Sequence, residues 1–326
     1  MPPIQFRHYL TPAILLLLSA CSSENDPPLD PTMDAGFFQN QTFSMDSINR
    51  DYHLYLPENR NQASIVFIMH GNSGSSDQVV GLEGTKAPHR LWLDIAEREN
   101  LILVVPNGLP GNDGNRGWND CRNDAPTIPD SDDVAFISAL IDTVQSEYSG
   151  GLSPVFFVGT SNGGHMTMRL AEEIPEKLTA VATLVASKPV NTECADASVV
   201  LPILIMNGTE DPLVPFEGGS IASNRGEVYS TPDMVAYWVN RNLASVNPIE
   251  EAIADIDPDD ESTITRSTYT NSSGDAVVEY YEVRGGGHTE PSIAERYGRL
   301  FKLIVGTQNG DIEMAEVVWE FFDSVN

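Results

Sequence analysis

Short, continuously apolar runs recur along this chain and alternate with longer segments whose apolar residues have helical spacing. A strand that is apolar on both faces needs cover on both, and such strands occur mainly in parallel sheets packed between helices. We therefore predict an α/β fold with a mostly parallel central sheet flanked by helices on both faces. The predicted strands are 65–69, 101–105, 155–158 and 203–206, and the predicted helices between them are 89–99, 132–148 and 162–173.

The chain is strongly acidic and long enough for one large core. It has 326 residues, and 18 Lys and Arg stand against 47 Asp and Glu, for a formal charge of -29. A field of that sign repels phosphate backbones, so we expect no nucleic-acid partner. The most acidic segment, 249–261, is predicted to be a mobile loop. A calcium site is the alternative there, although the usual ligand spacing is missing.

The first twenty residues contain Arg7 and then an apolar stretch that ends in Leu18-Ser19-Ala20-Cys21. This pattern resembles the signal peptide of bacterial lipoproteins, and the stretch is too short to span a bilayer stably. The resemblance implies that residues 1–20 are removed and that an acylated Cys21 is the only membrane contact. We expect a flexible tether at 21–40, a catalytic domain at 41–326 and a place in the bacterial cell envelope. A plain cleaved signal, or a cysteine there by chance, is the alternative.

Two cysteines, Cys121 and Cys194, remain if Cys21 carries lipid. An even remainder in an oxidising compartment predicts one disulfide between them. Two buried free thiols are the alternative, since the sequence does not show whether the two Cα atoms lie within bonding distance.

The pentapeptide Gly159-Thr160-Ser161-Asn162-Gly163 follows one predicted strand and precedes a predicted helix. G-x-S-x-G in this position is typical of a nucleophilic serine on a sharp turn, where glycines allow a strained backbone and close approach of the neighbouring chain. The helix N-terminus places partial positive charge beside an oxygen that must become negative. We predict that Ser161 is a nucleophile, and a tight turn with an exposed serine is the alternative.

A serine hydroxyl needs a base within hydrogen-bonding distance, and after such a turn an acid and then a histidine follow along the chain. His165 lies one turn along the helix that Ser161 begins, so the predicted base is His288, in a glycine-rich segment after a strand at 277–283. The acid should follow strand 203–206, where we choose Asp211 over Glu210. Its task is to hold one imidazole tautomer.

Two N–H groups must also face the oxyanion that forms during acyl transfer. One is predicted to be the backbone N–H of Asn162, the residue after the serine. The other is expected from the loop that follows Met69, where we assign Asn72, with Ser73 as its rival. An ordinary glycine turn is the alternative for this loop.

Several motifs, in one order along the chain, resemble the esterase and polyhydroxybutyrate depolymerase family of the α/β-hydrolase superfamily, which includes feruloyl and acetylxylan esterases. The resemblance implies an α/β-hydrolase fold, the triad Ser161, Asp211 and His288, and a place for Trp118 in the acyl or aromatic pocket. The chain departs from the family at Asn72-Ser73-Gly74 and in the acidic segment. The motifs are His70-Gly71, Gly117-Trp118-Asn119, Asp132-Asp133-Val134-Ala135-Phe136, Gly159-Thr160-Ser161-Asn162-Gly163-Gly164, Asn207-Gly208-Thr209-Glu210-Asp211-Pro212-Leu213-Val214-Pro215-Phe216 and Gly286-Gly287-His288-Thr289.

These observations lead us to expect hydrolysis of carboxylic esters through a serine acyl-enzyme, with no metal and no organic cofactor. The expected substrates are feruloyl or acetyl esters of polysaccharides, or short hydroxyalkanoate esters. A serine peptidase of the same fold is one alternative, although the chain before Ser161 is too short for the propeller domain usual in those enzymes. A non-catalytic glycan- or surface-binding lipoprotein is the other, against which the intact order of Ser, Asp and His argues.

Overall fold

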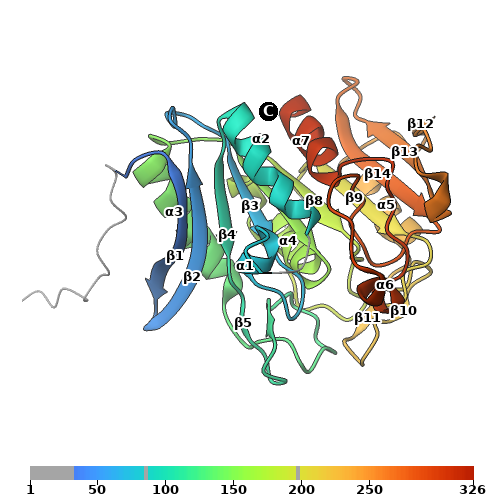
Figure 1. Ribbon diagram of the computed structural model, residues 1–326, viewed down its shortest axis with the longest axis horizontal. Coiled ribbons are helices and arrows are strands. Elements are labelled where there is room, and N and C mark those ends of the chain that lie inside the picture. Colours follow the sequence, from blue (N-terminus) through green and yellow to red (C-terminus); the bar gives the residue numbers. More distant parts are fainter. Residues whose placement is uncertain (1–32, 84–86, 196–198) are drawn as a thin grey trace, which may run out of the picture.

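The computed structural model describes residues 33–83, 87–195 and 199–326, and a ten-stranded sheet runs through it (Figure 1). Neighbouring strands from β4 to β14 are parallel, and the strands at both edges are antiparallel. In their order across the sheet, the strands are β1 (Gly36–Met45), β2 (Ile48–Leu56), β4 (Ile102–Pro106), β3 (Ile65–Met69), β7 (Val155–Thr160), β8 (Ala180–Leu184), β9 (Ile203–Gly208), β14 (Ala276–Arg284), β13 (Thr263–Thr270) and β12 (Ile249–Ala252).

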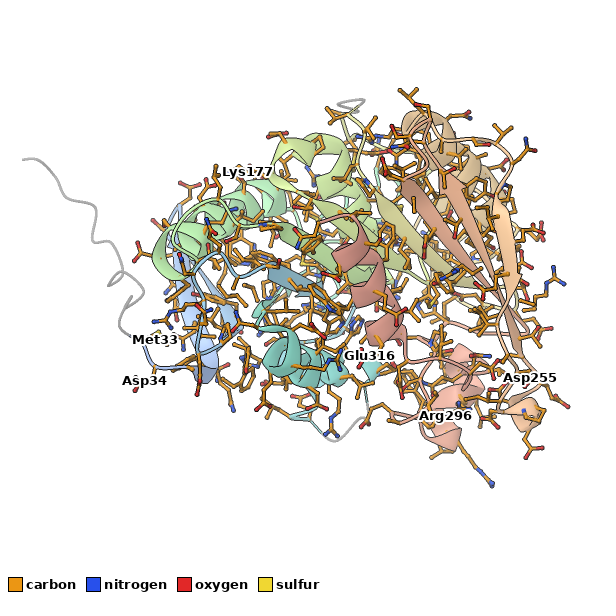
Figure 2. All side chains as sticks on the ribbon, turned by 90° about the horizontal axis from the view of Figure 1, so that it is seen from above. Met33, Asp34, Lys177, Asp255, Arg296 and Glu316 are labelled. Carbon is orange, nitrogen blue, oxygen red and sulfur yellow. A yellow bond between two sulfur atoms is a disulfide. The ribbon has the colours of Figure 1, made fainter. Side chains whose placement is uncertain are left out.

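Helices cover the sheet on both faces. One face packs against α3, α4 and α5, and the other packs against α2 and α7, whose Trp92 and Phe322 stack with ring centroids 6.3 Å apart. In Figure 2, Lys177 lies beside the first layer and Glu316 lies on the second. The helices are α1 (Ser76–Val79), α2 (Leu91–Glu99), α3 (Asp133–Tyr148), α4 (Asn162–Glu173), α5 (Thr231–Arg241), α6 (Arg299–Val305) and α7 (Met314–Ser324).

These layers confirm the predicted fold class. β3, β4 and β8 are buried at every position, which is why they appear in the sequence as continuous apolar runs. The predicted helix at 132–148 is present as α3, and the Asp132 side chain caps it by accepting a hydrogen bond from the Ala135 N–H at 3.0 Å.

Two small hairpins and three short helices complete the described fold. β5 (Leu109–Pro110) pairs with β6 (Arg116–Gly117), and β10 (Gly219–Ser220) pairs with β11 (Glu227–Val228). The 3-10 helices are Pro88–Arg90, Pro175–Lys177 and Pro258–Asp260. The two hairpins matter for the site, because each contributes a residue that contacts the loop after β3.

The tether predicted at 21–40 is too long at its C-terminal end. β1 begins at Gly36 and pairs with β2, so residues 36–40 belong to the sheet. Phe38 and Phe43 of this strand pack against the core, which gives the segment enough apolar burial to be ordered. The expected signal peptide and Cys21 lie outside the described residues.

The prediction of a mobile loop at 249–261 is wrong. Residues 249–252 form β12, which pairs with β13, and Glu251 is joined to Arg266 by an ion pair of 2.7 Å. The carboxylate of Asp260 accepts hydrogen bonds from the N–H groups of Ser262 at 2.9 Å and Gly310 at 2.7 Å. Acidic side chains suit an edge strand, because charge discourages pairing with another sheet. Figure 2 shows this edge near Asp255 and Arg296.

A disulfide joins Cys121 and Cys194, whose Cα atoms lie 5.6 Å apart, as the cysteine pattern predicted. The bridge spans a sequence separation of 73 residues, and a loop of that size restricts the unfolded chain by about 4 kcal/mol in the chain-entropy account. Glu173 lies close to both sulfur atoms, but a disulfide offers no thiolate to a metal ion. In the ranges described above, none of the helices has the length and apolarity that crossing a membrane requires.

Candidate active site

Ser161 stands on a sharp turn between β7 and α4. Its backbone has φ 55° and ψ -120°, a conformation that non-glycine residues rarely adopt and that persists only where the surroundings enforce it. The flanking glycines make the turn possible: a Cβ on Gly163 would collide with the carbonyl oxygens of Met69 and His70. The Ser161 N–H donates to the carbonyl of Leu184 at 2.9 Å, which ties the turn to β8.

His288 and Asp211 lie side by side at the carboxyl ends of β14 and β9. The ring Nδ1 of His288 is 2.7 Å from Oδ2 of Asp211, and both side chains are largely buried. The other oxygen, Oδ1, accepts from the N–H groups of Leu213 at 2.7 Å and Val214 at 2.8 Å, so both carboxylate oxygens are held in place. Glu210 is exposed instead. The geometry therefore pairs His288 with Asp211 and not with Glu210.

Ser161 and His288 both line a cavity of about 380 Å³, together with the loop that follows β3. The polar lining residues include Asn72, Ser73, Gln78 and Arg225, and α6 contributes part of the apolar lining. The apolar lining residues are Val79, Ala87, Leu213, Phe301, Ile304 and Val305.

The loop after β3 carries the two candidate oxyanion donors, the backbone amides of Asn72 and Ser73. The N–H of Ser73 donates to the carbonyl of Arg116, on β6, at 2.8 Å, which occupies it. The side chain of Asn72 is best oriented with Oδ1 toward Ser73 and toward the guanidinium of Arg225, the latter at 3.2 Å. The backbone N–H of Asn162, in the first turn of α4, has no partner within its helix.

Buried side chains hold these amides in place. Asn162 accepts from the N–H of Trp118 at 2.7 Å and donates to the carboxylate of Asp120 at 2.6 Å. Asp120 is in turn held by Arg122 at 2.7 Å, and both are buried. Burial raises the pKa of Asp120, but the charge of Arg122 and the hydrogen bonds outweigh burial and leave that pKa below its ordinary value. Asp120 thus stays ionised and fixes Asn162.

Trp118 does not occupy the position in the acyl pocket that the resemblance implied. Its side chain has no exposed surface and is not among the residues that line the cavity. The indole N–H donates to the carbonyl of His70 at 2.9 Å, and the two rings lie 5.1 Å apart. A tryptophan in a glycine-containing loop can face a ligand or the core, and here packing behind the β3 loop decides for the core.

His70 is fixed as a neutral ring at the base of that loop. Its Nδ1 lies 2.7 Å from the carbonyl oxygen of Gly71, and its Nε2 accepts from the N–H of Gly108 at 2.9 Å. Burial lowers the pKa of His70 to about 4, so the ring carries no charge at neutral pH. His165 is also buried, and burial lowers its pKa to about 3. Both rings are therefore poor proton acceptors at neutral pH.

A second group of polar residues, which the sequence did not reveal, lies beside the serine. The hydroxyl of Thr160 donates to Glu290 at 2.6 Å, and the Tyr297 hydroxyl donates to the other carboxylate oxygen at 2.6 Å. His89 Nε2 lies 2.8 Å from the Thr160 hydroxyl and 3.6 Å from Glu290. The only local signal was proximity: Thr160 precedes the serine, and Glu290 stands two residues after His288.

Burial and the charge of the partner have opposite effects on the pKa values of Glu290 and His89. Burial raises the pKa of Glu290, but His89 and the hydroxyl donors lower it by more. The pKa is therefore below its ordinary value and the carboxyl remains ionised. Burial lowers the pKa of His89, although the charge of Glu290 opposes the effect. The group therefore fixes the end of β7 to the loop that carries His288.

The sheet order and the strand–serine–helix turn define this protein as an α/β-hydrolase. Within that class, the chain belongs to the phospholipase/carboxylesterase family, whose model matches residues 54–231. Family membership makes it a carboxylic ester hydrolase and confirms the fold and the esterase class that the motifs implied.

Individual relatives agree with that family. A protein of Nocardia uniformis subsp. tsuyamanensis, provisionally named esterase NocK, is 27% identical over 82% of this chain and 75% of its own length. Feruloyl esterase D of Neurospora crassa is 27% identical over 62% of this chain and 68% of its own. Acetyl xylan esterase from Aspergillus awamori shares the fold, with a TM-score of 0.53 and 16% identity over 82% of this chain and 98% of that one.

Proposed function

We propose that Ser161, His288 and Asp211 form the catalytic triad of this ester hydrolase. The observation that carries the proposal is the 2.7 Å contact between His288 Nδ1 and Asp211, in a ring that lines the same cavity as Ser161. Because Asp211 holds Nδ1, the ring's Nε2 is left to accept the proton of the serine hydroxyl. Glu210 is exposed and is not the acid of this proposal.

In the first step, Ser161 Oγ bonds to the ester carbonyl carbon as its proton moves to His288 Nε2. The carbon–oxygen bond to the alcohol then breaks, and the alcohol leaves with that proton. Water attacks the acyl-enzyme with His288 as base, and the acid is released with Ser161 restored. We assign the oxyanion to the backbone N–H groups of Asn162 and Asn72, because the rival donor on Ser73 is occupied by Arg116.

The proposed substrates are feruloyl or acetyl esters of polysaccharides, or short hydroxyalkanoate esters. Relatives named as feruloyl esterases and a neighbour in fold named as an acetyl xylan esterase support the first class. The apolar wall of the cavity supports acyl groups of modest size.

We also propose that the protein is an envelope lipoprotein, with a signal peptide at 1–20, acylated Cys21 and a tether that ends before Gly36. The catalytic domain is then the remainder of the chain to residue 326. The disulfide supports an oxidising compartment. Cys21→Ala should release the protein from membranes, and membrane retention of this variant in fractionated cells would contradict the anchor.

A hydrolysis screen of the purified protein tests the activity. It compares p-nitrophenyl acetate and butyrate, methyl ferulate, acetylated xylan and hydroxybutyrate oligomers, with Ser161→Ala as the control. A fluorophosphonate probe should label the wild-type chain and not the variant. No turnover and no labelling would favour a binding protein that has the fold without the chemistry.

A further inference from the structure

Arg225 is the one lysine or arginine among the described residues that line the cavity of Ser161 and His288. It lies in the turn between β10 and β11. A permanent positive charge is unusual at this place, because the chain as a whole has a formal charge of -29. Buried and neutral His70 supplies no charge there, so the guanidinium is the main attraction for an anion.

The guanidinium is held but not neutralised. Its Nη2 donates to the side-chain oxygen of Asn72 at 3.2 Å, beside the proposed oxyanion amide. Over the described ranges, it forms no ion pair with a carboxylate. The charge of Arg225 acts on exposed Asp113, but the side chain of that residue is hydrogen-bonded to Asn115.

The backbone under Arg225 is tied to the nucleophile turn. Arg122 donates from Nη1 to the carbonyl of Arg225 at 2.6 Å. Its Nη2 donates to Asp120, which is the hydrogen-bond partner of Asn162. The cavity's acidic lining residue, Glu290, has both oxygens occupied by hydroxyl donors and does not compete for the guanidinium. Arg225 is therefore placed to pair with an anionic group of a ligand.

Apolar residues of α6 also line the cavity. Phe301 is 40% exposed and Ile304 is 63% exposed, so both present apolar surface at the cavity. A ligand that matches this lining has an apolar part and an anionic group. Arginine binds carboxylates in a bidentate manner that a neutral hydroxyl or phenol does not reproduce.

We propose that Arg225 binds a free carboxylate of the substrate, so that the preferred substrates are esters that carry a second, ionised acid group. This proposal rests on the proposed function, since Ser161 attacks the ester that carries this acid group. In a dimer of 3-hydroxybutyrate, Ser161 takes the acyl unit and His288 returns the proton to the hydroxyl of the departing unit. That departing unit carries the carboxylate that Arg225 holds.

The test compares this dimer with its terminal primary amide, which has the same shape and ester bond but no charge. Wild-type kcat/KM should be about ten- to a hundredfold higher for the acid, mainly through KM, because a charge-assisted pair is lost in the amide. Arg225→Gln should bring the ratio of acid to amide near one, and Arg225→Lys should restore part of it. Arg98→Gln, which removes an exposed arginine of α2, should keep the wild-type ratio.

The outcomes separate the two proposals. Wild-type protein that cleaves p-nitrophenyl acetate but treats acid and amide alike would refute the carboxylate site and leave the esterase intact. A wild-type preference that survives in Arg225→Gln would refute the role of Arg225. If no ester is cleaved, the proposed function fails as well. Should Arg225→Gln not fold, raising NaCl to about 1 M must lower wild-type kcat/KM for the acid and spare the amide, or the proposal is wrong.

Discussion

Two histidine–carboxylate pairs contribute to the same cavity, and they differ in what lies between ring and acid. His288 meets Asp211 directly, at 2.7 Å. His89 lies 3.6 Å from Glu290, and the Thr160 hydroxyl contacts both of them. The direct contact uses one ring nitrogen of His288 and leaves the other for a proton. In the second pair, the hydroxyl and both carboxylate oxygens are already committed.

A histidine and a carboxylate near each other therefore do not by themselves make a reactive pair. Glu290 is almost fully buried and holds Thr160 and Tyr297 in fixed positions, whereas Asp211 holds a ring that lines the cavity beside Ser161. We therefore expect the first pair to govern turnover and the second to govern the stability and alignment of the nucleophile turn. Substitutions in the two pairs should separate those roles.

The largest effect is expected at the reacting groups. Ser161→Ala and His288→Ala should each lower kcat by about 10⁴- to 10⁶-fold, and the double variant should be hardly worse, because triad members act as a unit. His89→Gln should retain at least a hundred times the turnover of His288→Ala in the same p-nitrophenyl acetate assay. Near-normal turnover in His288→Ala at neutral pH would show that another group is the base.

Next in size is the acid of the first pair. Asp211→Asn should lower kcat by about 10⁴-fold with little loss of folded protein, because an amide favours the wrong imidazole tautomer. Exposed Glu210→Gln is the matched control and should hydrolyse esters at close to the wild-type rate. A reversal of these two results would assign the acid to Glu210.

The acid of the second pair should show the opposite balance. Glu290→Gln should lower the free energy of unfolding by about 1–3 kcal/mol in urea titrations, since an amide cannot accept both hydroxyl hydrogen bonds as strongly. Its kcat should fall less than a hundredfold, well short of Asp211→Asn. Glu316→Gln, at an exposed ion pair with Arg98, should cost under about 1 kcal/mol. Abolished turnover with unchanged stability would instead place Glu290 in the chemistry.

The smallest effect concerns pH and the neutral buried rings. Burial lowers the pKa of His70 to about 4 and of His165 to about 3, so the unfolded chain binds protons that the folded chain excludes. Their contribution to stability is present above about pH 6.5 and is lost as pH falls from there toward the folded values. Each ring adds a slope of up to about 1.4 kcal/mol per pH unit.

Unfolding measured between about pH 6.5 and 4 tests this assignment. His165→Leu should flatten the slope by one proton, because it removes a ring whose pKa is lowered by burial in the folded chain. An unchanged slope in this variant would mean that His165 is charged when folded or titrates normally.

The elements that could be predicted from sequence are those with strong local patterns. β3 and α4 were expected at their observed positions, because apolar runs and helical spacing are visible within a few residues. The segment at 249–261 was misjudged for the same reason. Its acidic composition is a local property, whereas its pairing as β12 with residues 265–268 depends on a distant strand.

Local sequence is enough to predict the α/β class, the strand–serine–helix turn at Ser161 and the chain order of serine, acid and histidine, because these depend on neighbours along the chain. Only the tertiary structure decided between Asp211 and Glu210, buried Trp118 behind the β3 loop, and brought Glu290 to Thr160 and Arg225 to Asn72. Those contacts join segments up to 153 positions apart in the printed numbering, from 72 to 225. Contacts of that separation form only when the sheet brings distant strand ends to one edge, and no local pattern encodes them.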